Sequence, residues 1–121
     1  MVTRTELLQS SCQHRSEAAT DAQLRDALAV LADWHAEHGK LVRSFSFRDY
    51  HQTIAFVNAI AAVIHREDHH PELVVGYNRC TVRYDTHSVN GGQGGLSDND
   101  FICAAKIDDV YQQGSWQNTT A

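Results

Sequence analysis

The chain of 121 residues has a single proline, few cysteines and no long apolar run, and each scarcity excludes a class of protein. With 42% hydrophobic residues and only Pro71 as proline, the composition indicates a folded domain rather than a disordered chain. Its three cysteines, Cys12, Cys80 and Cys103, lie far apart and form no CxxC pair. This pattern argues against a disulfide framework and a cysteine-based zinc site, and it favours reduced thiols.

Basic charge and membrane signals are also scarce. The formal net charge is −5, so no positive field favours nucleic acid or anionic lipid. No apolar run reaches the ~18 residues of a membrane-spanning helix, and the N-terminal stretch has no apolar core of signal-peptide length. We therefore expect a cytoplasmic protein with no membrane association and no direct nucleic-acid partner.

Apolar spacing of three and four residues, typical of amphipathic helices, occurs in three stretches. These predicted helices cover about residues 20–32, 48 to 68–70, and 97–112. The second helix should end at residues 68–70, because Pro71 disfavours helical geometry in the preceding residue. It carries two adjacent apolar rows, so it is either the core helix of a monomer or a helix covered by its sheet and by another subunit.

Alternating apolar and polar residues, together with a strand from Glu72 that is apolar on both faces, predict two pairs of strands. The first pair lies on either side of a tight turn at His38-Gly39, and the second pair meets at Asn78-Arg79. His87 falls on the polar face of the last strand, near its end. The order α-β-β-α-β-β-α predicts a single α+β domain, with a four-stranded, largely antiparallel sheet and three helices packed on one face. We assign a polar N-terminal arm, loosely held, to 1–19, the domain to 20–113 and a tail to 114–121.

The segment HREDHHP, residues 65–71, concentrates charged and titratable side chains. His65 and His69 are four residues apart on a predicted helix and could face one metal ion, although the order of residues is not HExxH. The segment is also typical of a solvated helix end, where histidine interacts favourably with the helix dipole. A third interpretation is acid–base catalysis, in which His69 and His70 act together with His87. The residues by themselves leave all three interpretations open.

Residues downstream of the doublet add a more specific pattern. The doublet HHP at 69–71 is followed by an aromatic residue, a third histidine and, beyond a glycine-rich loop, an aspartate, which are Tyr77, His87 and Asp100. The pattern also includes the surrounding segments HHPEL, VGYN and GLSDND, and, upstream of them, Trp34 and the segment FSFRDY. In this combination, over about residues 20–112, the chain resembles the pterin-4a-carbinolamine dehydratase family.

The resemblance implies an enzyme that dehydrates 4a-hydroxytetrahydropterin to quinonoid dihydropterin, recycling the pterin cofactor of aromatic amino acid hydroxylases. It implies histidine acid–base catalysis with no metal and no cofactor of the enzyme's own. By position, His69 and His87 would be the acid–base groups and His70 would hold the pterin. The residues implied in substrate binding are Trp34, His65, Tyr77 and Asp100. The family also implies a homodimer or homotetramer.

Alternatives to these assignments stand beside the resemblance. Ser97 and Asp100 fit a helix capping box, so Asp100 has a structural interpretation as well as a functional one. Trp34 could equally be a core residue, and an aromatic residue such as Tyr77 is more often one. The alternative function is a weakly active or inactive family member that serves as a protein-binding, assembly or transcriptional dimerisation cofactor.

Three departures from the family pattern bear on the expected activity. His65 stands where the family commonly has glutamate, and Asn99 stands where many members have arginine. The loop NGGQGG, before the last predicted helix, is longer than in familiar members. An imidazole at position 65 could make a hydrogen bond there, but it would not supply a fixed negative charge.

Overall fold

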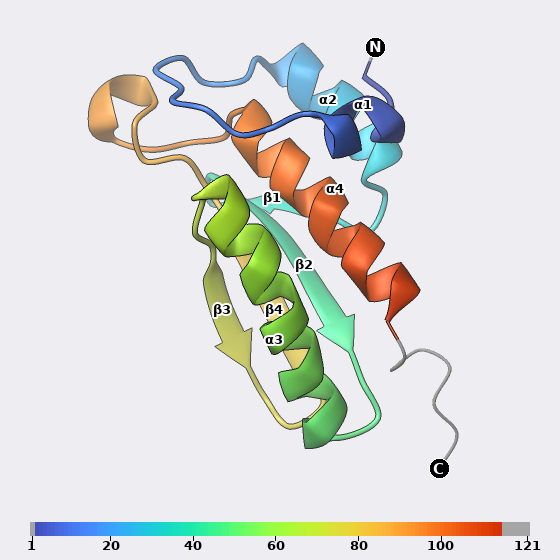
Figure 1. Cartoon of the computed structure of the whole chain (residues 1–121). Helices are drawn as coiled ribbons and strands as arrows, with labels where there is room; N and C mark the ends of the chain where they lie inside the picture. Colours follow the sequence, from blue (N-terminus) through green and yellow to red (C-terminus); the bar gives the residue numbers. More distant parts are fainter. Residues whose placement is uncertain (1, 115–121) are drawn as a thin grey trace.

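Four strands form one antiparallel sheet in the computed structural model of the chain, which describes residues 2–114 (Figure 1). They are β1 (His35–Glu37), β2 (Lys40–Ser46), β3 (Glu72–Val75) and β4 (Arg79–Tyr84), in the spatial order β1-β2-β4-β3. His38 and Gly39 form the turn between β1 and β2 with φ of 51° and 76°. Positive φ at both residues is the geometry of a tight two-residue hairpin. The predicted hairpin and the predicted antiparallel sheet are confirmed.

Four helices accompany the sheet within the described residues: α1 (Arg4–Gln9), α2 (Asp21–Val30), α3 (Tyr50–Glu67) and α4 (Asp98–Gln113). Side chains cap all four of them, because Thr3, Thr20, Asp49 and Ser97 each accept a hydrogen bond from a backbone N–H of the first turn. α3 ends where Asp68 adopts a left-handed backbone with φ of 50°, close to the end predicted from Pro71. α3 and α4 lie side by side on one face of the sheet (Figure 1). The α+β class is confirmed.

The N-terminal stretch is more ordered than the loosely held arm expected at 1–19. Arg4–Gln9 forms α1, which Thr3 caps and which packs on α4 with Leu7 buried. Beyond α1, the N–H of Gln13 donates to Oδ1 of Asn99 (3.2 Å) and Nδ2 of Asn99 donates to the carbonyl oxygen of Gln13 (2.6 Å). Leu7-Leu8 is too short an apolar run to predict this helix, because its packing partner lies near the other end of the chain. The predicted tail at 114–121 lies, apart from residue 114, outside the described residues.

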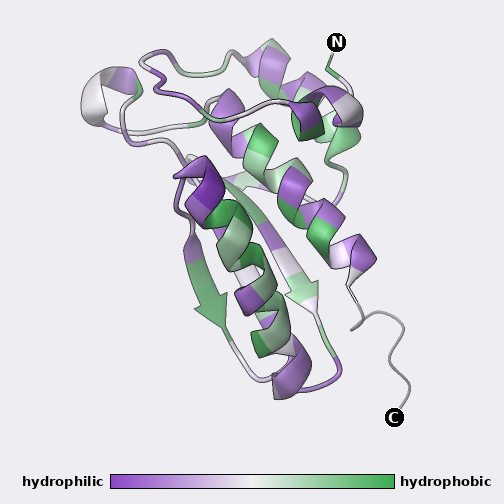
Figure 2. Cartoon of the chain, viewed as in Figure 1, coloured by the Kyte–Doolittle hydropathy of each residue, from purple (hydrophilic) through white to green (hydrophobic). Residues whose placement is uncertain are grey.

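The core fills the space between the helices and the inner face of the sheet. Its large, fully buried side chains include Leu41, Phe45, Phe56, Ile60, Val82 and Tyr84. The rings of Phe45 and Phe56 are 4.8 Å apart and join β2 to α3. Figure 2 shows the apolar residues of α3 and α4 as stripes along the helices. Each large apolar side chain contributes about 1.5–3 kcal/mol on burial, so this core fixes how β4 and the start of α4 sit relative to each other.

The opposite face of the sheet is mostly polar, although it also carries the buried Val42 and the exposed Val74. The hydroxyl groups of Ser44 and Thr81 are 2.8 Å apart across β2 and β4, and Arg83 pairs with Glu72 of β3 at 3.2 Å. Side chains alternate between the two faces of a strand. This polar face therefore accounts for the alternation that predicted the strands.

The two apolar rows of α3 have different surroundings. Phe56, Ile60 and Val63 are buried in the core, whereas the other row is only partly covered and begins with Tyr50, which is 49% exposed. Covering of this row by another subunit remains a prediction. Although α3 has 18 residues, no helix within residues 2–114 is long and apolar enough to cross a membrane.

Candidate active site

An open cavity of about 560 Å³ lies where the arm, the end of α3 and the segment after β4 come together. Imidazoles and carboxylates dominate its lining: His14, His69, His70, His87, Glu67, Asp68 and Asp85. The structure therefore brings together the three histidines that the sequence singled out as catalytic candidates. The cavity also gains a fourth histidine from the arm.

His69 is held on three sides. Its Nε2 lies 2.7 Å from Oδ1 of Asp100, and its ring stacks on that of Tyr84 with centroids 5.0 Å apart. The Tyr84 hydroxyl donates a hydrogen bond to the backbone carbonyl oxygen of His69 (3.1 Å). Because a carboxylate accepts hydrogen bonds, Nε2 carries the proton. Nδ1 makes no hydrogen bond within residues 2–114, so this nitrogen is left to exchange a proton with a ligand.

Asp100 is fully buried and uses both carboxylate oxygens. Oδ1 binds His69, while Oδ2 accepts from the Thr86 hydroxyl and from the Ser97 N–H, each at 2.9 Å. The predicted capping box of Ser97 and Asp100 is confirmed, and the same carboxylate holds the histidine. Because Asp100 is not among the residues that line the cavity, it is placed to act through His69 rather than to touch a ligand.

The surroundings of His69 favour its charged form. Burial of the ring lowers its pKa, but the hydrogen bond from His69 to Asp100 and the charge of that carboxylate outweigh burial, so the pKa of His69 is raised above the ordinary value for histidine. The imidazolium is therefore favoured at higher pH than in a free histidine. Such a ring is suited to donating a proton near neutral pH.

His70 and His87 are much more exposed than His69, with 61% and 86% of their side chains accessible. His87 Nε2 lies 3.4 Å from Oδ1 of Asp85, a carboxylate that also pairs with Lys40 at 3.5 Å. The prediction that His87 lies on the polar face of a strand is wrong, because β4 ends at Tyr84 and His87 follows in the loop. Its exposure leaves the ring free to adjust to a ligand.

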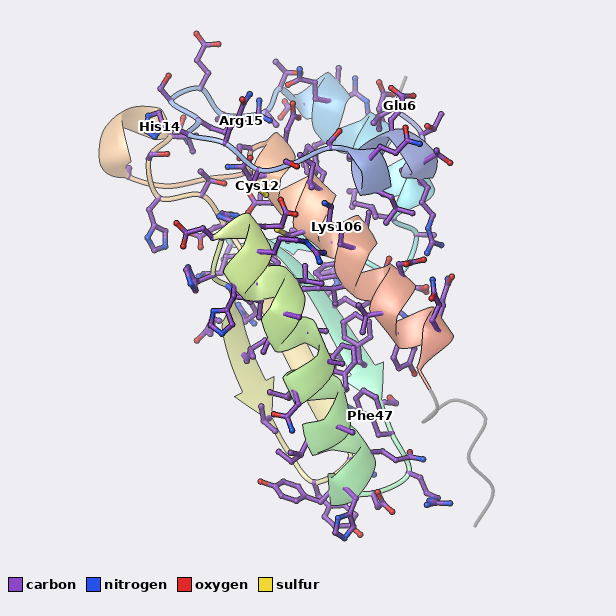
Figure 3. All side chains as sticks on the ribbon, viewed as in Figure 1. Glu6, Cys12, His14, Arg15, Phe47 and Lys106 are labelled. Atoms are coloured by element: carbon purple, nitrogen blue, oxygen red, sulfur yellow. The ribbon has the colours of Figure 1, made fainter. Side chains whose placement is uncertain are left out.

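Glu67 and Lys106 form a buried ion pair beside the cavity, at 2.9 Å. The interpretation of residues 65–71 as a solvated helix end is wrong for Glu67, because its side chain is only 4% exposed beneath the arm. Burial raises the pKa of Glu67, but hydrogen bonds from the Cys12 N–H (2.9 Å) and from Lys106 outweigh it, so the pKa is lowered. Figure 3 shows Cys12 and His14 on the arm as it passes the start of α4. Sequence reasoning missed Glu67 and His14, since no local pattern indicates where the arm folds.

All four residues that the resemblance assigns to substrate binding, Asp100 included, lie outside the cavity lining. Trp34 is buried and donates from Nε1 to Oδ1 of Asp108 (2.8 Å). Tyr77 lies in the turn after β3, 66% exposed, and stacks on Tyr50. His65 is exposed in the last turn of α3. In the described part of the chain, no group of three or more His, Cys, Asp or Glu side chains is arranged to hold a metal ion.

Comparison with protein families gives one clear match. The family model described as pterin 4 alpha carbinolamine dehydratase matches residues 17–110. A protein of Bdellovibrio bacteriovorus, provisionally named as such a dehydratase, is 55% identical over 108 residues, covering 89% of this chain and 90% of the relative. One of Nitrosospira multiformis with the same provisional name is 46% identical over 101 residues, covering 84% of this chain and 86% of the relative.

Solved structures show the same likeness. A transcriptional coactivator/pterin dehydratase from Brucella melitensis aligns with a TM-score of 0.70 and 29% identity, covering 78% of this chain and 98% of that protein. A pterin dehydratase-like protein, identified as a RuBisCO assembly factor in the alpha-carboxysome, aligns with a TM-score of 0.53 and 23% identity, covering 67% of this chain and 89% of that protein. The second likeness concerns the fold alone.

Proposed function

Since this chain belongs to the pterin-4a-carbinolamine dehydratase family, we propose that it dehydrates 4a-hydroxytetrahydropterin to quinonoid dihydropterin. The observation that most supports this proposal is the buried Asp100, which holds His69 at the cavity wall with Nδ1 unbonded within residues 2–114. Dehydration needs one proton donor and one proton acceptor, and the cavity lining supplies imidazoles for both tasks. Its product would return to the cofactor cycle of aromatic amino acid hydroxylases.

In the proposed reaction, His69 acts as the acid. Its imidazolium donates a proton from Nδ1 to the 4a-hydroxyl oxygen, the C4a–O bond breaks and water leaves. His87 accepts the proton from N5, and the electron pair of that N–H bond forms the C4a=N5 double bond. Transfer of a proton from His87 to solvent and from solvent to His69 restores both groups.

The unequal exposure of the histidines supports this division of roles. His69 is 13% exposed and anchored at Nε2 by Asp100, so it can protonate a leaving group at a fixed position. His70 and His87 are exposed enough to close on a bound ring. We therefore assign pterin holding to His70. A cavity of about 560 Å³ falls within the usual range of roughly 300–1,000 Å³ for small-molecule sites.

A protein-binding or assembly role is the alternative function. The Brucella melitensis structure includes "transcriptional coactivator" in its name, and the alpha-carboxysome protein is an assembly factor. Binding or assembling another protein does not require the arrangement seen here, in which the fully buried Asp100 carboxylate is hydrogen-bonded to His69 on the wall of an open cavity. This pair therefore favours catalysis for the present chain.

The proposed function is tested by following the formation of quinonoid dihydropterin from 4a-hydroxytetrahydropterin by absorbance. We expect wild-type protein to accelerate the reaction, and His87→Ala to lower kcat by about 10²-fold because the proton acceptor is lost. His51→Ala, which removes an exposed histidine of α3 outside the cavity lining, is the control and should match the wild type. A wild-type rate equal to the uncatalysed rate, together with a stoichiometric partner in a pull-down, would favour the alternative.

Replacing Trp34 tests whether this side chain is structural. Asp108 accepts hydrogen bonds from Trp34 Nε1 and from Arg43 (2.7 Å). We expect Trp34→Phe to lower the free energy of unfolding by about 1–2 kcal/mol, because the buried Asp108 carboxylate loses one of these donors. Urea unfolding followed by circular dichroism measures this. KM for the pterin should stay unchanged, whereas a raised KM would place Trp34 against the substrate.

A further inference from the structure

Two thiols from opposite ends of the chain meet at the edge of the cavity. The Sγ atoms of Cys12, on the arm, and Cys103, in α4, are 3.4 Å apart. Cys103 is fully buried, whereas Cys12 is half-buried and lines the cavity. We propose that Cys12 and Cys103 form a reversible disulfide that fastens the N-terminal arm to α4 beside the histidine cavity.

The surrounding contacts already aim Cys12 at its partner. The Cys12 N–H is bonded to Glu67, and the next residue, Gln13, is bonded in both directions to the side chain of Asn99. These contacts hold the arm against the first turn of α4, one helical turn before Cys103. A disulfide has an S–S distance of ~2.0 Å. Closing the bond therefore requires the two sulfur atoms to approach by little more than 1 Å, a shift that the arm can supply.

The two thiols also share a hydrogen bond that prepares them for oxidation. The pKa of Cys103 is lowered, first by its hydrogen bond with the Cys12 thiol and also because His69 lies nearby. The pKa of Cys12 is raised by the same hydrogen bond and by burial. The thiolate, which is the reactive form of cysteine, thus forms first within the pair at Cys103.

A peroxide that enters the cavity reaches Cys12 first, because Cys103 is fully buried. The Cys103 thiolate acts as the base: it takes the Cys12 proton while the Cys12 sulfur attacks the peroxide and breaks its O–O bond. The hydroxide that leaves takes up a proton from solvent, which replaces the one lost when Cys103 ionised, so the products are a Cys12 sulfenic acid and one water. The Cys103 sulfur then displaces the sulfenic hydroxyl group, which leaves with a proton as a second water, and the S–S bond forms. In sum, two thiols and one peroxide give one disulfide and two waters.

The bond would change the cavity as well as the arm. Cys12, Gln13 and His14 all line the cavity, and the Cys12 N–H bonds to Glu67 in its wall. Drawing the Cys12 sulfur toward α4 moves this stretch of the lining with it. Thiol reductants would reverse the change. Neither the formation of the disulfide nor its reduction depends on the dehydratase reaction, so the inference stands apart from the proposed function.

The chain lends itself to a direct test by peptide mapping. Trypsin places the three cysteines in separate peptides: Cys12 in 5–15, Cys80 in 80–83 and Cys103 in 84–106. The folded protein is treated with hydrogen peroxide, and remaining thiols are then alkylated before digestion. We expect peptide 5–15 joined to 84–106, peptide 80–83 alkylated, and loss of the link on treatment with dithiothreitol. Formation should be roughly tenfold or more faster in the folded protein than in concentrated urea, where the two cysteines are separated by a long loop.

Variants separate this disulfide from other oxidation. Cys80→Ser removes the cysteine that lies outside the pair and should leave the link intact, whereas Cys12→Ser, at the half-buried position, should abolish it. In the oxidised wild type, tryptic cleavage after Arg15 in the folded protein should slow by roughly tenfold, because the arm opens less often. Alkylation of both Cys12 and Cys103 after peroxide treatment would overturn the proposal. So would a link that includes Cys80, joins two molecules, or forms equally fast in urea.

Discussion

His69→Ala is expected to lower kcat for pterin dehydration by about 10²–10⁴-fold, the largest effect of any single histidine. The ring loses both its proton-donating Nδ1 and its bond to Asp100, which then keeps only the Thr86 and Ser97 donors. Absorbance of the quinonoid product measures the rate, and circular dichroism establishes that the variant is folded.

Two further substitutions separate chemistry from structure at this position. In His69→Gln, the side-chain amide can still donate a hydrogen bond toward Asp100, but it cannot act as the acid. This variant should therefore be as inactive as His69→Ala. His70→Ala removes the adjacent histidine, which is 61% exposed, and should act mainly by raising KM. Recovery of wild-type kcat in His69→Gln would contradict the role of His69 as acid and leave it a purely structural one.

Asp100→Asn is expected to combine the largest loss of stability with a change in pH dependence. Asp100 is fully buried and accepts hydrogen bonds from three groups, so replacing the carboxylate should lower the free energy of unfolding by about 3–5 kcal/mol. It should also lower the pKa of His69, which this carboxylate raises. Activity that needs the His69 imidazolium would then be lost at lower pH than in the wild type.

The sign of the stability effect follows from the same pKa. His69 has a folded-state pKa above its unfolded value. Its pairing with Asp100 therefore makes its full contribution to the stability of the fold at pH values below the unfolded pKa of ~6.5. This contribution is lost as the pH rises through the folded-state pKa, and it should be absent in Asp100→Asn. Urea unfolding across this pH range measures the free energy of unfolding of the wild type and of Asp100→Asn. Asp98→Asn, at a carboxylate that is 50% exposed in the same helical turn, is the matched control. An Asp100→Asn protein with the wild-type pH profile would refute the coupling.

The elements that local sequence could predict are those determined by neighbouring residues. The turn at His38-Gly39 needs only positive φ at two positions, the Ser97 cap binds backbone and side-chain groups within the next three residues, and α3 ends next to Pro71. The spacing of apolar residues was sufficient for the sheet and the three longer helices. Each of these features depends on contacts between residues close in sequence or on a simple period.

The candidate site was predictable only in part. The doublet at 69–70, with His87, could be identified because the family pattern is written in the sequence, and the structure places all three at one cavity. Trp34 belongs to the same pattern but lies outside that cavity, hydrogen-bonded to Asp108. A motif therefore indicates which residues matter to a family more reliably than it indicates where each side chain lies.

The sequence by itself determined the α+β class, the order of its elements, the Ser97 cap of α4 and the histidine doublet, because short-range preferences and a family pattern carry them. Only the tertiary structure decided that the arm packs on α4, that Glu67 is buried against Lys106, and that Cys12 meets Cys103. It also decided that one carboxylate, Asp100, both caps a helix and holds His69. These contacts join residues distant in the chain, and their free energy depends on burial and charge that exist only once the core has formed.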